Sequence, residues 1–357
     1  MKYHLIPQNG HFYKANLHTH SVISDGTRTV EEIKADYKAH GYQVVAFTDH
    51  DIMIDHSDLN DKDFLAITSY EVETTKQDIR WSKAPTYHLN FYAKRADATY
   101  YPCANPAYAF GNAPKYVQDY YKGDYVRRYS VEGQNEMIAD ANTHGFLVCY
   151  NHAAWSLQHY PDYAGLEGLC ALEVYNTGCY REGYALDATE HVLDDMLSLG
   201  KRVYPVASDD SHSTWDCFGG FTVLKAPELT YDHIMTALEQ GDLYASWGPE
   251  IHALSIENGV VKMDCTPVRE VFVKTDGRCA QRDVASTPEG MAHYEVNLAP
   301  YFEEVRTLGI ADKAYFRLTL VDFDGNKAVT RGYFADEIPE NARGLSHTET
   351  LHKGENL

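Results

Sequence analysis

The 357-residue sequence lacks any run of 18 consecutive apolar residues, so we expect no transmembrane helix and no membrane partner. It also has little positive charge, because 31 Lys and Arg stand against 52 Asp and Glu, for a formal charge of -21. A chain this acidic repels a phosphate backbone, and the clustered Lys and Arg that would bind one are missing. We therefore expect no extended nucleic-acid partner.

Cysteine is also sparse. The seven cysteines are scattered and none forms a C-x-x-C pair, which argues against a disulfide framework or a thiolate zinc site. The segment 1–18 lacks the basic region, apolar stretch and small-residue cleavage site of a signal peptide. We therefore expect a cytoplasmic protein with reduced thiols, and homo-oligomer formation stays open.

The rest of the composition, 44% hydrophobic with 24 Gly and 13 Pro, is that of a folded chain. Over the first 250 residues short apolar runs alternate with helical patterns, which predicts repeated βα units around a parallel sheet. A capping box at Thr29-Val-Glu-Glu32 predicts a helix that ends at Gly41, and a second helix is predicted from Gly183 to Leu199. The predicted strands are 13–17, 44–48, 64–70, 88–92, 146–150, 171–175 and 203–207.

Two segments depart from this rhythm. Residues 87–129 contain ten tyrosines and three prolines, and such a long tyrosine-rich insertion predicts a cap over the site, at about 93–130. After Gly248-Pro249 the pattern becomes short alternating strands with turn signals, which predicts an antiparallel β-sandwich. The predicted division is therefore a domain over 1–249, a sandwich over 250–340 and a polar tail over 341–357.

Polar residues with metal-binding side chains gather at the predicted strand ends. His18 and His20 are two apart on an extended chain, so both imidazoles point to the same side. In barrels of parallel strands the carboxyl ends converge on one face, where active sites are built. The other candidates at such positions are Asp25, His50, Glu71, His88, His152, Asp210 and His212.

Imidazoles and carboxylates without thiolates are ligands for Zn, Mn or Fe. A lone histidine such as His152 is more often a core or surface residue than a ligand. The coincidence of residue type and position at six predicted strand ends favours a shared metal site. Four further acids are candidates to orient the imidazoles, namely Asp49, Asp51, Glu73 and Asp209.

These motifs resemble a known family. NLHTHSVISDG, FTDHD, Glu71, His88, the Asn-His pair at 151–152 and the Asp-Ser-His segment at 210–212 are similar to the PHP (polymerase and histidinol phosphatase) superfamily, over roughly residues 10–250. EVYN at 173–176 and GPE at 248–250 look more like the subgroup of the carbaryl hydrolases. The resemblance implies a distorted (β/α)7 TIM-like barrel and a trinuclear metal centre with three divalent ions per chain.

The resemblance also implies how nine residues divide among the metals. His18, His20, Glu71 and Asp210 would hold the first ion. Glu71 would bridge to a second ion held by His88 and His152. Asp25, His50 and His212 would hold the third. In the Asp-x-His pattern of this family, Asp210 rather than Asp209 is the expected ligand.

A hydroxide shared by bridged metals is a nucleophile at neutral pH, which favours hydrolysis of a phosphate mono- or diester of a small molecule. The residues expected to take part in the chemistry are Glu71, Asp210, Asp25 and His212. Arg127 and Arg128 in the cap, and Arg181 and Asn176 at the EVYN segment, are candidates for substrate contact.

Three alternatives stay open at this point. A carbamate, ester or amide hydrolase would use the same hydroxide on carbon and would need an aromatic pocket wall, whereas phosphate needs convergent positive charge. An exonuclease acting on short oligonucleotide ends is less compatible with the acidic chain. In the last alternative the metals only stabilise the fold of a binding protein.

Overall fold

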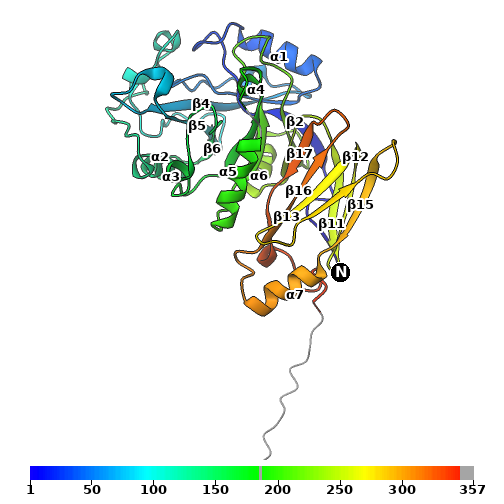
Figure 1. Ribbon diagram of the computed structural model, residues 1–357. Helices are drawn as coiled ribbons and strands as arrows, with labels where there is room; N and C mark the ends of the chain where they lie inside the picture. The colour runs from blue at the N-terminus through cyan, green and yellow to red at the C-terminus, as the bar shows by residue number, and fades with distance from the viewer. Residues whose placement is uncertain (185–186, 346–357) are drawn as a thin grey trace, which may run out of the picture.

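In the computed structural model, which describes residues 1–184 and 187–345, a large mixed sheet carries helices on its flanks and continues into an antiparallel C-terminal region (Figure 1). The large sheet has 14 strands, in the order β14-β13-β16-β17-β10-β9-β2-β3-β4-β5-β6-β7-β8, with β18 paired to β16. Most of its strand pairs are antiparallel, and the parallel pairs are β2–β3, β3–β4, β6–β7 and β7–β8.

All seven predicted strands are present. They are β2 (His11–Asn16), β3 (Val44–Phe47), β4 (Leu65–Thr75), β5 (Thr86–Ala93), β6 (Phe146–Tyr150), β7 (Ala171–Asn176) and β8 (Tyr204–Ser208). Residues of β3, β5, β6 and β7 are all buried, as expected for apolar strands covered on both faces. β9 (Phe221–Ala226) and β10 (Leu243–Ser246) follow in sequence and join β2 to the C-terminal strands.

The expectation of a parallel sheet is wrong at β5, β9 and β10, and β10 pairs antiparallel with β9. β5 runs antiparallel to both β4 and β6, and β9 runs antiparallel to β2. Residues 76–85, between β4 and β5, include only the short 3-10 helix η2 (Trp81–Lys83), and a parallel connection would need a longer crossover. Since β5 is reversed, its first residues lie at the same sheet edge as the last residues of β3.

No ladder in the described part of the chain closes the sheet, so the expected (β/α)7 barrel is not confirmed. β8 is the last strand of the order. Beyond its end, an isolated parallel bridge joins Ser211 to Thr19, and the N–H of Asp210 donates to the carbonyl of His18 at 3.0 Å. The segments that follow β2 and β8 therefore lie side by side.

Local signals place the helices. The capping box at Thr29 and Glu32 is present and starts α1 (Val30–Ala39). The helix predicted from Gly183 is observed as α5 (Asp187–Ser198), and residues 185 and 186 lie outside the described ranges. The remaining helices are α2 (Val131–Thr143), α3 (Tyr160–Tyr163), α4 (Thr177–Arg181), α6 (Tyr231–Gln240) and α7 (Ala299–Leu308). None of the described helices has the length and hydrophobicity needed to cross a membrane.

The predicted cap segment begins at the last residue of β5 and contains the 3-10 helices η3 (Pro106–Tyr108) and η4 (Ala113–Lys115). None of its described residues after Ala93 lies in a strand. Its aromatic rings pack on the body of the protein: Tyr101 stacks on Tyr121 with ring centroids 3.9 Å apart, and both are buried. The Tyr101 hydroxyl donates to the carbonyl of Met53 at 2.7 Å. These two rings thus belong to the core, whereas Tyr100, Phe110 and Tyr120 of the same segment are exposed. A cap over the site stays a prediction.

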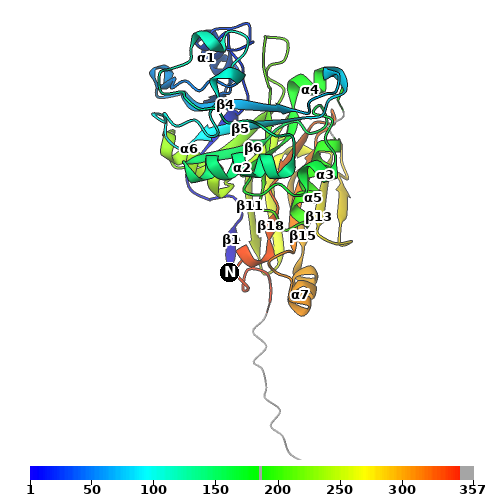
Figure 2. The same ribbon diagram turned by 90° about the vertical axis from the view of Figure 1, so that its left-hand side faces the viewer.

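The C-terminal strands are antiparallel and lie in two sheets that share one apolar core. The small sheet has the order β1-β11-β12-β15, so the first residues of the chain pair with β11 (Figure 2). Its strands are β1 (Lys2–His4), β11 (Ile251–Glu257), β12 (Val260–Val268) and β15 (Met291–Asn297). The strands facing it are β13 (Glu270–Thr275), β14 (Gln281–Val284), β16 (Tyr315–Val321), β17 (Lys327–Thr330) and β18 (Tyr333–Phe334).

The second group of strands continues directly into the main sheet, because β17 pairs with β10. The domain boundary at residue 249 stays a prediction. Residues 346–357 of the predicted polar tail lie outside the described part of the chain.

Candidate metal centre

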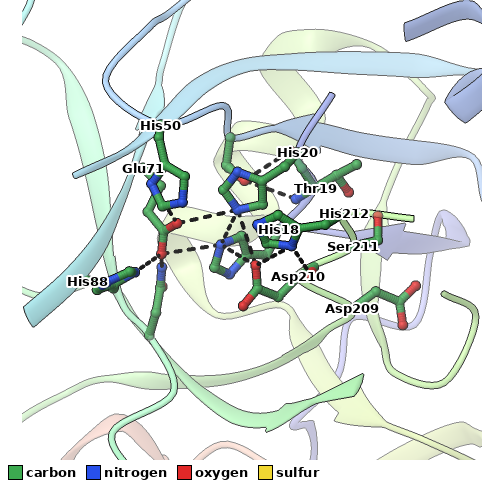
Figure 3. Close-up of polar contacts among 12 residues, drawn as sticks. His18, Thr19, His20, His50, Glu71, His88, Asp209, Asp210, Ser211 and His212 are labelled. Carbon is green, nitrogen blue, oxygen red and sulfur yellow. Dashed lines mark hydrogen bonds and ion pairs between the residues drawn. The ribbon is translucent and has the colours of Figure 1, made fainter. Parts of the chain in front are cut away.

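His18 and His20 lie just beyond β2, with Thr19 between them (Figure 3). The backbone N–H of Thr19 donates to the Thr48 hydroxyl at 2.9 Å, so this segment is fixed against the end of β3. The alternation along an extended chain turns the two imidazoles to one side. Their Nε2 atoms are 3.2 Å apart, and both rings are fully buried.

Glu71 lies within β4, and its two carboxylate oxygens face different imidazoles. Oε1 is 2.9 Å from Nδ1 of His88 and 3.4 Å from Nε2 of His152. Oε2 is 3.3 Å from both Nε2 of His20 and Nδ1 of His50. Figure 3 shows this carboxylate between the surrounding rings. Its position suits a carboxylate that bridges two ions.

Asp210 and His212 come from the segment after β8. Asp210 has a positive φ of 53°, a backbone region that Asp tolerates better than most residues. This turn directs its carboxylate to Nε2 of His18 and Nε2 of His20, 3.2 and 3.1 Å from Oδ1. His212 and Asp25 lie further out, with 3.5 Å between Nε2 and Oδ2, and both side chains are partly exposed.

All nine residues predicted as metal ligands are brought together by the structure. Their ligand atoms fall into overlapping groups whose members lie within 4.8 Å of one another. The groups are His20, Asp25, His50 and His212; His18, His20, Glu71 and Asp210; His18, His152 and Glu173; and Glu71, His88 and His152.

The donor set fits divalent cations. Three buried atoms in it, Nδ1 of His20, Nδ1 of His50 and Oδ1 of Asp210, have no hydrogen-bond partner. Polar atoms of neighbouring side chains nevertheless lie 3.1 to 3.6 Å from them, without hydrogen-bond geometry. Buried polar atoms that approach a common point without forming hydrogen bonds have the arrangement of ligands around an ion.

The carboxylates of this cluster require positive charge nearby. Burial alone would lower the pKa of His20, but the neighbouring carboxylates of Asp210 and Glu71 raise it to about 10. Burial would raise the pKa of Glu71, but the charges of His18, His88 and His50 hold it well below its usual range. A divalent ion would supply the same positive charge.

Glu173 was missed by the sequence prediction as a metal-site residue. It is fully buried in β7, and its Oε1 lies 2.9 Å from Nδ1 of His18 while its Oε2 accepts from the N–H of His152 at 3.2 Å. Asn176 donates to Glu173 and to Asp210, both at 3.1 Å. The available signal was a single acid inside the otherwise apolar run 171–175.

Asn151 is a second residue that was not predicted, and its side chain donates to Oε1 of Glu71 at 2.8 Å. Asp49 and Asp209, expected to orient imidazoles, instead fix loops. Asp49 accepts from the backbone N–H groups of Ser21 and Ser24, and Asp209 accepts from Tyr37 and from the N–H groups of residues 218–220. Both carboxylates position the segments that carry the candidate ligands.

The four predicted substrate contacts occupy different environments. Arg127 is buried, paired with Asp51 and stacked on the Tyr108 ring at 4.0 Å. Arg128 is exposed and pairs with Glu136. Arg181 is exposed and donates to the carbonyl of residue 217 at 3.3 Å, while Asn176 caps α4. Substrate contact by these residues stays a prediction.

A pocket of about 640 Å³ opens above the cluster. Its floor includes the candidate ligands Asp25, His50, Glu71, His88, His152, Asp210 and His212. Its wall includes Trp81, Phe110, Trp155, Tyr184 and Trp215, together with Glu73 and Glu182. None of the described residues that line this pocket is Lys or Arg.

No protein-family profile matches the chain, and no curated protein matches it. Solved structures that match this chain include a two-domain protein of Bacteroides vulgatus, described as containing a predicted PHP-like metal-dependent phosphoesterase. It is 14% identical, with a TM-score of 0.45, over 92% of this chain and 98% of that one.

Two further similar structures have other activities in their descriptions. An amidohydrolase from Chromobacterium violaceum is 13% identical, with a TM-score of 0.37, over 64% of this chain and 96% of that one. A lesion-specific endonuclease from Pyrococcus furiosus is 13% identical, with a TM-score of 0.39, over 64% of this chain and 56% of that one.

Proposed function

We propose that this chain is a metal-dependent hydrolase of the PHP type that cleaves a phosphate ester of a small molecule. The observation that carries the proposal is the position of Glu71. Its two oxygens face separate sets of imidazoles at the floor of an open pocket. This is the arrangement expected of a carboxylate between two ions that act on one substrate.

We further propose three ions per chain, of Zn, Mn or Fe, and a distorted barrel. The two overlapping groups that contain Glu71 and the outer group of Asp25, His50 and His212 support the number three. The bridge between Thr19 and Ser211 supports a barrel-like closure of β2 against β8. Bound there, the ions would supply Lewis acidity and lower the pKa of a water molecule.

The protein's own residues position the reacting groups. Glu173 and Asn151 fix His18 and Glu71 by hydrogen bonds, which keeps the floor of the pocket rigid. His212 and Asp25 are partly exposed at the mouth, where a leaving-group oxygen would lie. As ligands of the outer ion they would hold positive charge beside that oxygen, which stabilises the negative charge that develops on it as the bond breaks.

The test starts with metal content per chain after purification without added metal. The protein is then stripped with a chelator, reloaded separately with Mn, Zn or Fe, and assayed on chromogenic phosphomonoesters, phosphodiesters and aryl carbamates. We expect about three ions per chain and phosphoester turnover that the chelator removes and a metal restores. Absence of phosphoester turnover with every metal would overturn the proposal.

One observation favours a second candidate, a carbamate, ester or amide hydrolase like the carbaryl hydrolases. The described lining of the pocket has aromatic rings and no Lys or Arg, which suits an uncharged aryl substrate. A phosphoester needs its charge neutralised, and in this site the ions themselves would have to do so. Turnover of aryl carbamates without any phosphoester turnover would establish this second candidate.

A further inference from the structure

Tryptophan side chains are concentrated in the lining of the pocket above the candidate metal centre. Three of the four tryptophans in the chain, Trp81, Trp155 and Trp215, line it, and they come from three different loops. Trp81 is 72% exposed and Trp215 is 54% exposed. Indole rings left uncovered around one opening are a binding surface for a ring-shaped or planar group, because stacking buries their faces.

Trp155 joins this surface to the floor of the pocket. Its ring lies edge-on to His88 and His152, with centroids 5.4 and 5.2 Å apart. Its indole N–H donates to Glu182 at 2.9 Å, which fixes the ring orientation. A group stacked on Trp155 would therefore lie directly beside the candidate ligands.

The acids around the opening have no Lys or Arg counterpart among the described residues of the pocket lining. Glu73 and Glu182 line the pocket, and no described lining residue is Lys or Arg. Ionised carboxylates only accept hydrogen bonds, so their natural partners are N–H and O–H groups. A second anionic group on the substrate would face this acidic wall unpaired, which costs affinity.

We propose that the organic part of the substrate is a ring that stacks on these tryptophans, presents N–H or O–H donors to Glu182 and Glu73, and carries no negative charge. The inference rests on the proposed function, because it assumes that the hydrolysed group lies on the metals and the ring lies above them. Amino sugars, neutral sugars and nucleosides share this chemistry, whereas bisphosphates and sugar acids do not.

The first experiment measures binding without catalysis. Tryptophan fluorescence of the metal-free full chain is titrated with glucosamine, glucose, adenosine and glucuronate. We expect a saturable change with at least one of the first three probes, and at least tenfold weaker binding of glucuronate than of the probe that binds best. A preference for glucose or glucosamine would identify a sugar, and a preference for adenosine would identify a nucleoside. Binding of glucuronate as tight as that of the best of the other three probes, or no binding of any probe, would overturn the inference.

The second experiment uses matched variants. Glu182→Gln keeps the size and an acceptor but removes the charge, so it should reduce the discrimination against glucuronate by at least fivefold. Glu167→Gln changes an exposed acid that does not line the pocket and should leave the discrimination unchanged. Trp81→Ala should weaken probe binding, whereas Phe323→Ala, another exposed ring outside the pocket, should not. The inference would be contradicted if Glu182→Gln discriminated against glucuronate as Glu167→Gln does, and if Trp81→Ala bound the probes as Phe323→Ala does.

The probe-binding test and the phosphoester-turnover test can fail independently of each other. If the reloaded protein hydrolyses a chromogenic phosphoester but glucuronate binds as tightly as the best of the other three probes, the inference fails and the phosphoesterase stands. If the probes bind with the expected discrimination but no phosphoester is turned over with any metal, the ring-binding pocket stands and the phosphoesterase fails.

Discussion

Nδ1 of His18 lies 2.9 Å from Oε1 of Glu173, and this contact leaves Nε2 of His18 directed at Glu71 and Asp210. A carboxylate on one ring nitrogen fixes the tautomer and raises the basicity of the other nitrogen. Glu173 is completely buried in β7, so bulk solvent does not reach this contact. The pair links the interior of the sheet to the floor of the pocket.

We predict that Glu173→Gln weakens metal binding by about 10- to 100-fold while the chain stays folded. The amide keeps the shape but offers His18 a weaker acceptor without charge. Metal affinity is measured by competition with a chromophoric chelator, and folding by thermal unfolding monitored by circular dichroism. An unchanged affinity would show that Glu173 has no part in the metal centre.

A second prediction concerns the overlap of the ligand groups. His20 belongs to two groups, whereas His88 belongs to one. His20→Ala should therefore remove more metal per chain than His88→Ala, and both variants should keep a cooperative unfolding transition because the apolar core is untouched. Elemental analysis of both proteins after identical loading is the measurement. Equal losses would mean that the groups bind ions independently.

Much of this arrangement could be predicted from the chain alone. The apolar runs that end at His18, His50 and His152 mark strands that the structure contains, because their length and their polar ends are strong local signals. Since strand ends meet at one edge of a sheet, the local pattern was enough to bring the candidate ligands together. The direction of β5 was not predicted, because the sheet partners of a strand are not set by its own residues.

Glu173 and the aromatic wall could not be predicted for a different reason. Glu173 lies inside an apolar run, where a single acid does not reveal which residue it meets across the sheet. Trp81, Trp155 and Trp215 come from loops far apart in sequence, and only the fold places them around one opening. Contacts that depend on long-range packing leave no local pattern.

A third prediction tests how the cap segment is attached. The guanidinium of Arg127 is buried, pairs with Asp51 and donates to the carbonyl of Glu73 at 2.8 Å. Arg127→Met would leave the Asp51 carboxylate buried without its partner, a change that costs about 3 to 5 kcal/mol of the free energy of unfolding. Urea denaturation of the variant and the wild-type protein measures this difference in the free energy of unfolding. Arg128→Met is the control, because that side chain is exposed and should leave stability nearly unchanged.

The last prediction concerns pH and stability at the junction of α5 with β16, away from the metal centre. Asp194 accepts from Nε and Nη2 of Arg317 at 2.7 and 2.9 Å and pairs with Lys274. Burial alone would raise the pKa of Asp194, but the hydrogen bonds and charges of Arg317 and Lys274 hold it below its ordinary value.

An acid whose pKa is lower in the folded chain stabilises the fold above its unfolded pKa of about 3.9, and this contribution is lost as the pH falls toward the folded value. Asp194→Asn should therefore lower the free energy of unfolding at pH 7, by about 3 to 5 kcal/mol, since two cations lose their buried partner. The difference between the wild-type protein and the variant should stay constant between pH 7 and pH 5 and shrink below pH 4. Urea denaturation of the metal-free proteins across this range measures it, and a gap that widens toward low pH would contradict the assignment.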